Sequence, residues 1–108
     1  MAEGPLMFTI KRYATRGIAN EIGLELQLIL WAMIDSRKNK GIEIDYLQVF
    51  ELSIARKDGV SVQKVLHRQE CPPISDTYYL PMIETPIKMT IWAMDNEKYC
   101  TMLLPDEY

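Results

Sequence analysis

QVFELSIARKDGVSVQKVLHRQE, residues 48–70, is the stretch that decides the fold. Two runs in which apolar and polar residues alternate flank the dipeptide Asp58-Gly59, a strong signal for a tight turn. Each run contains β-branched residues, which are favoured in strands. The stretch therefore predicts an antiparallel β-hairpin, and its register decides which way the single histidine, His67, points.

Two registers are compatible with this turn. A loop made of the Asp-Gly pair alone places Phe50 opposite His67 and mixes polar and apolar side chains across the ladder. A three-residue loop that begins at Lys57 places Phe50 opposite Leu66 and gathers the large apolar side chains on one face. We favour the three-residue loop, which puts His67 on the opposite, wetter face of the sheet.

Before the hairpin, residues 22–40 have the periodicity of an α-helix. Asn20 is a possible N-cap, and Gly41 is placed to end the helix. An apolar stripe is expected to face the core: Leu26, Ile29, Leu30, Met33 and Ile34. A second stripe consists of Leu24, Leu28 and Trp31. One sheet covers only one side of a helix, so we expect the second stripe to contact the loop at 71–86, which we favour, or a second subunit or protein partner.

Weaker strand signals flank these elements. Residues 7–17 begin with an apolar–polar alternation and predict a first strand, preceded by a loose tail over residues 1–6. Residues 71–86 hold four of the six prolines and predict an ordered loop with at most a short edge strand. A second hairpin is expected around Asn96-Glu97, with Trp92 opposite Thr101.

Together these elements predict one α+β domain over residues 1–108, with one long helix packed on a mainly antiparallel sheet of about five strands. With 108 residues and 48% hydrophobic residues, the chain can bury a core without disulfides or metal. The longest apolar run, residues 28–34, is far shorter than the ~20 residues that span a bilayer. No signal peptide is recognisable, so we expect a cytoplasmic protein without membrane association, and two free thiols.

No catalytic or cofactor motif is recognisable, neither a glycine-rich phosphate loop nor a G-x-S-x-G elbow. His67 has an ordinary pKa near neutrality, but the sequence supplies no nucleophile or orienting carboxylate for it. His67 and Cys71 are too few ligands for a zinc site. We therefore expect no catalytic residue, no metal site and no cofactor.

The net charge of −3 argues against a dedicated nucleic-acid binder. If the first strand pairs with the hairpin, a mildly basic face could form around Tyr13 from Arg12, Arg16, Lys64 and Arg68. No nucleic-acid signature motif accompanies these residues. Nucleic-acid binding is therefore a second-ranked function.

Three parts of the chain, RYATRGIANEIGLELQLILWAMID, DYLQVFELS with QKVLHRQE, and IWAMDNEKYCTMLLPDEY, resemble the domain-of-unknown-function family nine-sixty of Gram-positive bacteria and their phages. The resemblance covers residues 8–108 and carries no assigned activity, cofactor or catalytic residue. The chain departs from the family pattern at Gly23, where the pattern has proline, and near Glu97, where it has glycine.

The resemblance implies a cytoplasmic protein of Gram-positive bacteria or their mobile elements. Small proteins of that setting often act by binding another macromolecule. We therefore rank a non-enzymatic interaction module first, weak nucleic-acid binding second and an enzyme third. The predicted interaction surface is Leu24, Leu28 and Trp31, toward a protein partner or a second copy of the chain.

Overall fold

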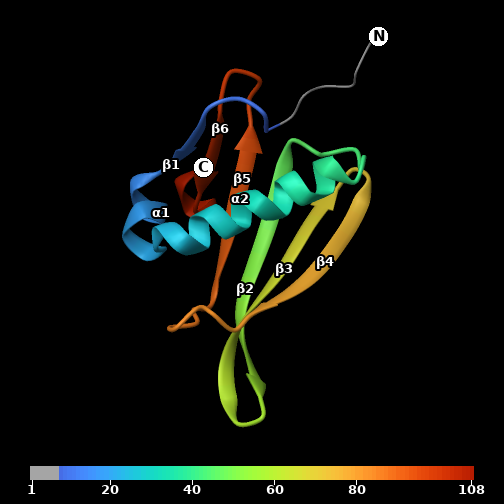
Figure 1. Cartoon of the computed structure of the whole chain (residues 1–108). Helices are drawn as coiled ribbons and strands as arrows, with labels where there is room; N and C mark the ends of the chain where they lie inside the picture. Colours follow the sequence, from blue (N-terminus) through green and yellow to red (C-terminus); the bar gives the residue numbers. More distant parts are fainter. Residues whose placement is uncertain (1–7) are drawn as a thin grey trace.

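The computed structural model describes residues 8–108, which form a six-stranded sheet with a helix lying across one face (Figure 1). The strands are β1 (Arg12–Ala14), β2 (Leu47–Lys57), β3 (Val60–Glu70), β4 (Pro73–Leu80), β5 (Met89–Asp95) and β6 (Cys100–Leu103). The helices are α1 (Arg16–Glu21), α2 (Leu24–Asn39) and the short 3-10 helix η1 (Pro105–Glu107). The order across the sheet is β1-β6-β5-β2-β3-β4, and only β1 and β6 pair in parallel. The α+β prediction is confirmed, with one strand more than expected, whereas the expected tail at 1–6 lies outside the described residues.

Helix α2 buries the stripe that was expected to face the core, with Leu26, Leu30, Met33 and Ile34 buried and Ile29 packed against them. The helix expected over residues 22–40 is α2, and a separate short helix that was not expected, α1, precedes it. Thr15 caps α1, because its Oγ1 accepts from the backbone N–H of Ile18, and Gly23 is the N-cap of α2. Asn20 lies inside α1 and caps neither helix, so that prediction is wrong. Gly41 has a φ of +78° just past α2, as a helix-ending glycine should.

The register of the β2–β3 hairpin is the one that we did not favour. Lys57 pairs with Val60, so the loop is the Asp-Gly pair, and Phe50 lies opposite His67. The two loop residues have φ of +52° and +80°, as a type I′ turn requires, and its twist matches that of the flanking strands. The turn geometry therefore outweighs the separation of polar from apolar side chains, and His67 faces α2 instead of solvent.

Asp95, at the end of β5, connects the β5–β6 hairpin to Phe8. This hairpin has a four-residue loop, with Asp95 opposite Cys100 and Trp92 opposite Leu103, so the expected pairing of Trp92 with Thr101 is wrong by two residues. The carboxylate of Asp95 accepts from the backbone N–H of Phe8 at 2.6 Å and from that of Glu97 at 2.7 Å. The first bond holds buried Phe8 against the sheet, and the first strand, which begins four residues later, has only three residues.

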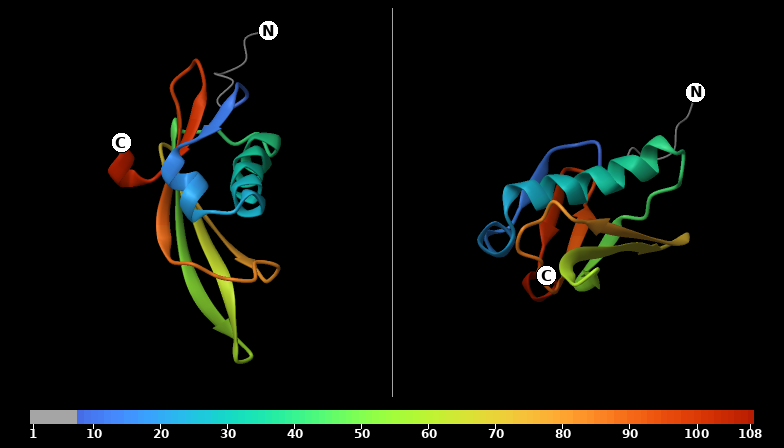
Figure 2. Two further views of the ribbon diagram at one scale, coloured as in Figure 1. Left: turned by 90° about the vertical axis from the view of Figure 1, so that its left-hand side faces the viewer. Right: turned by 60° about the horizontal axis from the view of Figure 1, so that its bottom comes forward.

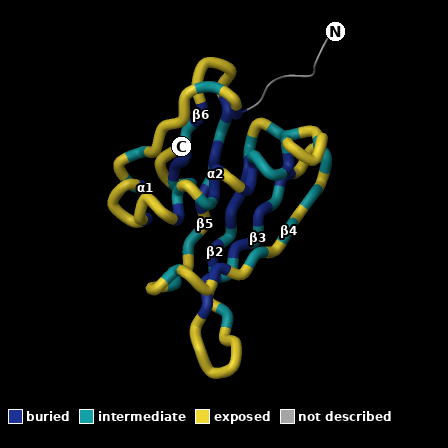
Figure 3. Tube along the Cα trace, viewed as in Figure 1, coloured by how far each residue is buried: buried dark blue, intermediate teal, exposed yellow. Residues whose placement is uncertain are grey.

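The segment expected to be mainly loop contains an eight-residue edge strand, β4, whose partner is β3. The loop at 81–88 follows it and leads to β5. Figures 1 and 2 show the β2–β3 hairpin extending beyond the rest of the sheet as an arm. The arm is exposed at its tip, whereas the centre of the sheet beneath α2 is buried (Figure 3). Within residues 8–108, no helix has the length and hydrophobicity needed to cross a membrane.

Candidate interaction surface

A cluster of buried polar side chains lies between the end of α2 and strands β2, β3 and β4. Arg37 is 1% exposed and is in phase with the apolar stripe of α2. Its guanidinium donates to the side-chain oxygens of Gln48 and Gln69, both at 3.3 Å, and to the backbone carbonyl of His67. Nε donates to Asp76, at 3.1 Å, and Asp76 is partly exposed. The buried cation therefore has acceptors on all sides, as burial of a charge requires.

His67 belongs to this polar cluster and is fully buried. Its Nε2 donates to the side-chain oxygen of Gln48 at 2.7 Å, since an amide oxygen can only accept, and its Nδ1 has no partner within the described chain. Burial, and secondly the charge of Arg37, lower the pKa of His67 from 6.5 to about 3. The expected position on the wet face is therefore wrong, and the neutral ring has no contact with solvent through which to exchange protons with a substrate.

The rest of the polar cluster fastens loops to the sheet. The side-chain amide of Gln69 donates to the carbonyls of Glu43 and Pro72, and that of Gln48 donates to the carbonyl of Asp45. These bonds fix the connection between α2 and β2 and the turn between β3 and β4. The arrangement has the character of a structural network, in which each buried amide satisfies loop carbonyls.

The four residues of the expected basic face do not come together. Strand β1 pairs with β6, so β6, β5 and β2 separate Arg12 and Arg16 from the strand that carries Lys64 and Arg68. Arg12 forms an ion pair with Asp35, and Arg68 forms one with Glu51 at 2.7 Å. The condition for that face, pairing of the first strand with the hairpin, is not met, and these residues form no continuous basic face within the described part of the chain.

Trp31 is separated from the other two residues of the expected interaction surface. It is 6% exposed, because its ring packs against Phe8 and beneath the guanidinium of Arg12, 5.0 Å from the ring centre. Trp31, which we predicted to belong to the interaction surface, is therefore covered within the chain. No local pattern predicts this contact, because Phe8 and its hydrogen-bond partner Asp95 are both far from Trp31 in the sequence.

Leu24 and Leu28 remain exposed, at 68% and 58% of their surface. They are four residues apart on α2 and so are neighbours on its surface. The alternative that we favoured, in which the loop at 71–86 covers them, is therefore wrong. We call these two residues the leucine pair.

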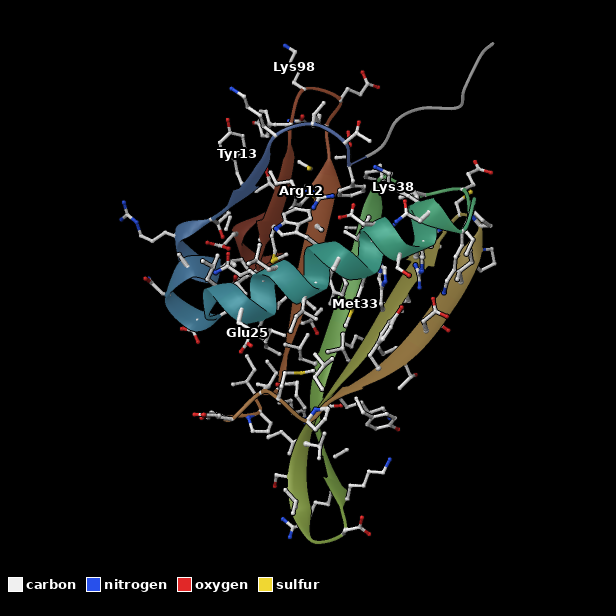
Figure 4. The ribbon with its side chains drawn as sticks, in the orientation of Figure 1. Arg12, Tyr13, Glu25, Met33, Lys38 and Lys98 are labelled. Carbon is white, nitrogen blue, oxygen red and sulfur yellow. The ribbon has the colours of Figure 1, made fainter. Side chains whose placement is uncertain are left out.

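A groove of about 540 Å³ lies between the first turn of α2 and the loop at 81–88, and Leu24 is the neighbour in sequence of Gly23 and Glu25, which line it. Its apolar lining consists of Ile22, Leu26, Met82, Ile83 and Ile87. Three carboxylates also line it: Glu21, Glu25 and Glu84. Figure 4 shows Glu25 at the edge of α2 that is turned toward this loop, with Arg12 at the opposite edge. Sequence reasoning missed the groove because it depends on where the proline-containing loop runs.

A second hollow, of about 490 Å³, lies on the face of the sheet opposite α2. Its lining mixes Glu51, Lys64 and Lys88 with hydroxyl and apolar side chains. Among residues 8–108, no group of three or more His, Cys, Asp or Glu side chains could hold a metal ion. Cys71 is exposed and Cys100 is buried, and burial is the main cause that raises the pKa of the Cys100 thiol.

Comparison with known proteins gives a family and a fold. The family model described as "Staphylococcal protein of unknown function (DUF960)" matches residues 11–107. The chain is also similar to a crystal structure of a protein of unknown function from Enterococcus faecalis, with 25% identity and a TM-score of 0.77. That match covers 100% of this chain and 98% of the other. No curated protein matches the chain.

Proposed function

The chain belongs to the DUF960 family, and we propose that it is a non-enzymatic module that binds another protein through the leucine pair and the adjoining groove. The exposure of Leu24 and Leu28 on one side of a well-packed helix carries this proposal. Exposure of two neighbouring large apolar side chains to water is unfavourable, and burial of each against a partner contributes about 1.5–3 kcal/mol to the free energy of binding. A partner-binding surface explains why they stay exposed.

The chemistry of the polar groups supports binding over catalysis. His67, the side chain best suited to acid–base work near neutral pH, is sealed in the core as a neutral ring. Arg37 is engaged by four acceptors and lines neither of the two hollows. Neither of the two hollows is lined by a histidine or a cysteine. Our proposal therefore assigns no reaction to these groups.

We also propose that the protein acts in the cytoplasm of Gram-positive cells. Cys71 is exposed and unpaired, a state that reducing compartments maintain.

A paired capture experiment tests the binding function. Wild-type protein and the Leu24→Gln/Leu28→Gln variant are used to capture proteins from native lysate, and mass spectrometry quantifies what each retains. Glutamine keeps helix propensity, and both positions are exposed, so the variant should fold. The matched control is Ile54→Gln/Val60→Gln, which removes two apolar side chains of similar exposure from the hairpin arm.

The expected result is a specific partner that wild type and the hairpin control retain and the helix variant loses. An identical set of retained proteins for all three would remove the basis of the proposal.

A further inference from the structure

Building on the proposed protein-binding function, we infer that the partner of the groove is a positively charged peptide segment with apolar anchor residues. The groove combines an apolar floor with a rim that carries charge of one sign only. Glu21, Glu25 and Glu84 line it, and no lysine or arginine does. Such a lining is complementary to apolar side chains that alternate with lysine or arginine.

The three carboxylates are not neutralised by the protein itself. The ion pairs of the described chain join Arg12 to Asp35, Arg37 to Asp76 and Arg68 to Glu51, and none includes a carboxylate of the groove. Lys88 follows Ile87 directly but belongs to the hollow on the other face of the sheet. The groove therefore presents uncompensated negative charge to whatever enters it.

The same charges disfavour a second copy as the occupant. A two-fold contact places the same surface of both copies face to face, so each carboxylate rim would meet another one. Each copy also has a net charge of −3, which adds a long-range repulsion. A phosphate-bearing ligand is disfavoured for the same reason.

The exposed apolar side chains and the exposed carboxylates contribute differently to affinity and to specificity. Met82 and the leucine pair are more than half exposed and can cover apolar anchors of the peptide, which supplies most of the affinity. The exposed carboxylates contribute less individually, and they select basic partners and accelerate association. Removal of all three charges should weaken binding about tenfold, and high salt should reproduce much of that loss.

Selection from random peptides displayed on phage provides an unbiased probe. Peptides that bind wild-type protein are sequenced, synthesised with a fluorescent label and measured by anisotropy at low and high salt. Each is measured against wild type, the charge variant Glu21→Gln/Glu25→Gln/Glu84→Gln and the leucine variant Leu24→Gln/Leu28→Gln. A charge-matched control, Glu43→Gln/Asp58→Asn/Glu70→Gln, removes three exposed carboxylates outside the groove.

We expect enriched peptides that combine lysine or arginine with apolar residues, that lose about tenfold in affinity on the charge variant and that retain it on the control. Peptides that depend on the leucine pair but are neutral or acidic would overturn this inference and leave the proposed function in place. If no peptide is enriched, or if the charge variant and the leucine variant bind the peptides as wild type does, this inference and the proposed function are both contradicted. If light scattering shows that the wild type is a dimer and the leucine variant is a monomer, the occupant is a second copy and the inference is overturned.

Discussion

The ring of His67 stacks on the ring of Phe50 across the β2–β3 hairpin, with centroids 4.5 Å apart and planes inclined by 20°. Both residues are fully buried beneath α2. The contact makes the histidine part of the core, where it serves as a flat, partly apolar side chain with a single hydrogen-bonded nitrogen. Its consequences can be measured in the stability of the protein.

Truncation of this ring should be costly. His67→Ala leaves a cavity between Phe50 and Arg37 and removes the hydrogen bond to Gln48, so we expect a loss of about 2–4 kcal/mol in the free energy of unfolding. Urea denaturation measures it. The neighbouring Arg68→Ala, on the other face of the sheet, is the control and should cost no more than about 1 kcal/mol. A cost for His67→Ala as small as for this control would place the ring outside the core.

Stability should also fall in mild acid. The pKa of His67 is about 3 in the folded protein and 6.5 when unfolded, so between these values the unfolded chain binds the extra proton. Protonation therefore favours unfolding as the pH falls below 6.5, and the effect is absent above it. We expect a loss of about 2 kcal/mol between pH 7 and pH 5 from this residue. Urea denaturation at both pH values, compared with His67→Gln, isolates the contribution, and equal pH slopes for the two proteins would contradict it.

Arg37 should contribute more to the free energy of unfolding than its ion pair with Asp76 does. Arg37→Met removes the side-chain donor from the backbone carbonyl of His67 and one of the two donors from each side-chain oxygen of Gln48 and Gln69, and we expect a loss of about 3–5 kcal/mol in the free energy of unfolding. Asp76→Ala leaves the arginine with those three acceptors and removes a partly exposed carboxylate, so its cost should be about 1 kcal/mol. Denaturation of both variants gives the comparison. Equal costs would mean that the ion pair, and not the buried amides, holds the arginine.

The sequence predicted the elements better than the contacts among them. The stripe from Leu26 to Ile34 and the stop at Gly41 follow from local periodicity and turn chemistry, and both are confirmed. The same periodicity places Arg37 on the core side, although a cation near the end of a helix is usually solvated. The burial of Trp31 and the groove depend on Phe8 and on the loop at 81–88, which come from distant parts of the chain. No local pattern contains that information.

Glu97 adopts a strained backbone conformation that a single substitution should relieve. Its φ is +79°, in the left-handed region that glycine adopts without steric cost. Glu97→Gly removes the clash of Cβ and keeps the backbone N–H that donates to Asp95. Glycine also adds conformational entropy to the unfolded chain, which offsets part of this relief. We expect a net gain of about 0.5–1 kcal/mol in the free energy of unfolding, measured by urea denaturation. Glu97→Ala keeps Cβ and is the control, and an equal gain in both variants would assign the effect to charge.

Nucleic-acid binding should be weak at physiological salt. Affinity for a polyanion grows with the number of phosphates that a continuous set of cations neutralises. Here Arg12 and Arg68 are held in ion pairs, and β6, β5 and β2 separate the two halves of the predicted basic face. Anisotropy titrations with labelled duplex DNA and single-stranded RNA near 150 mM salt should give dissociation constants above about 10 μM. Submicromolar binding would contradict this prediction. If Lys64→Gln/Lys88→Gln weakened that binding, the polyanion site would be the hollow on the face of the sheet opposite α2.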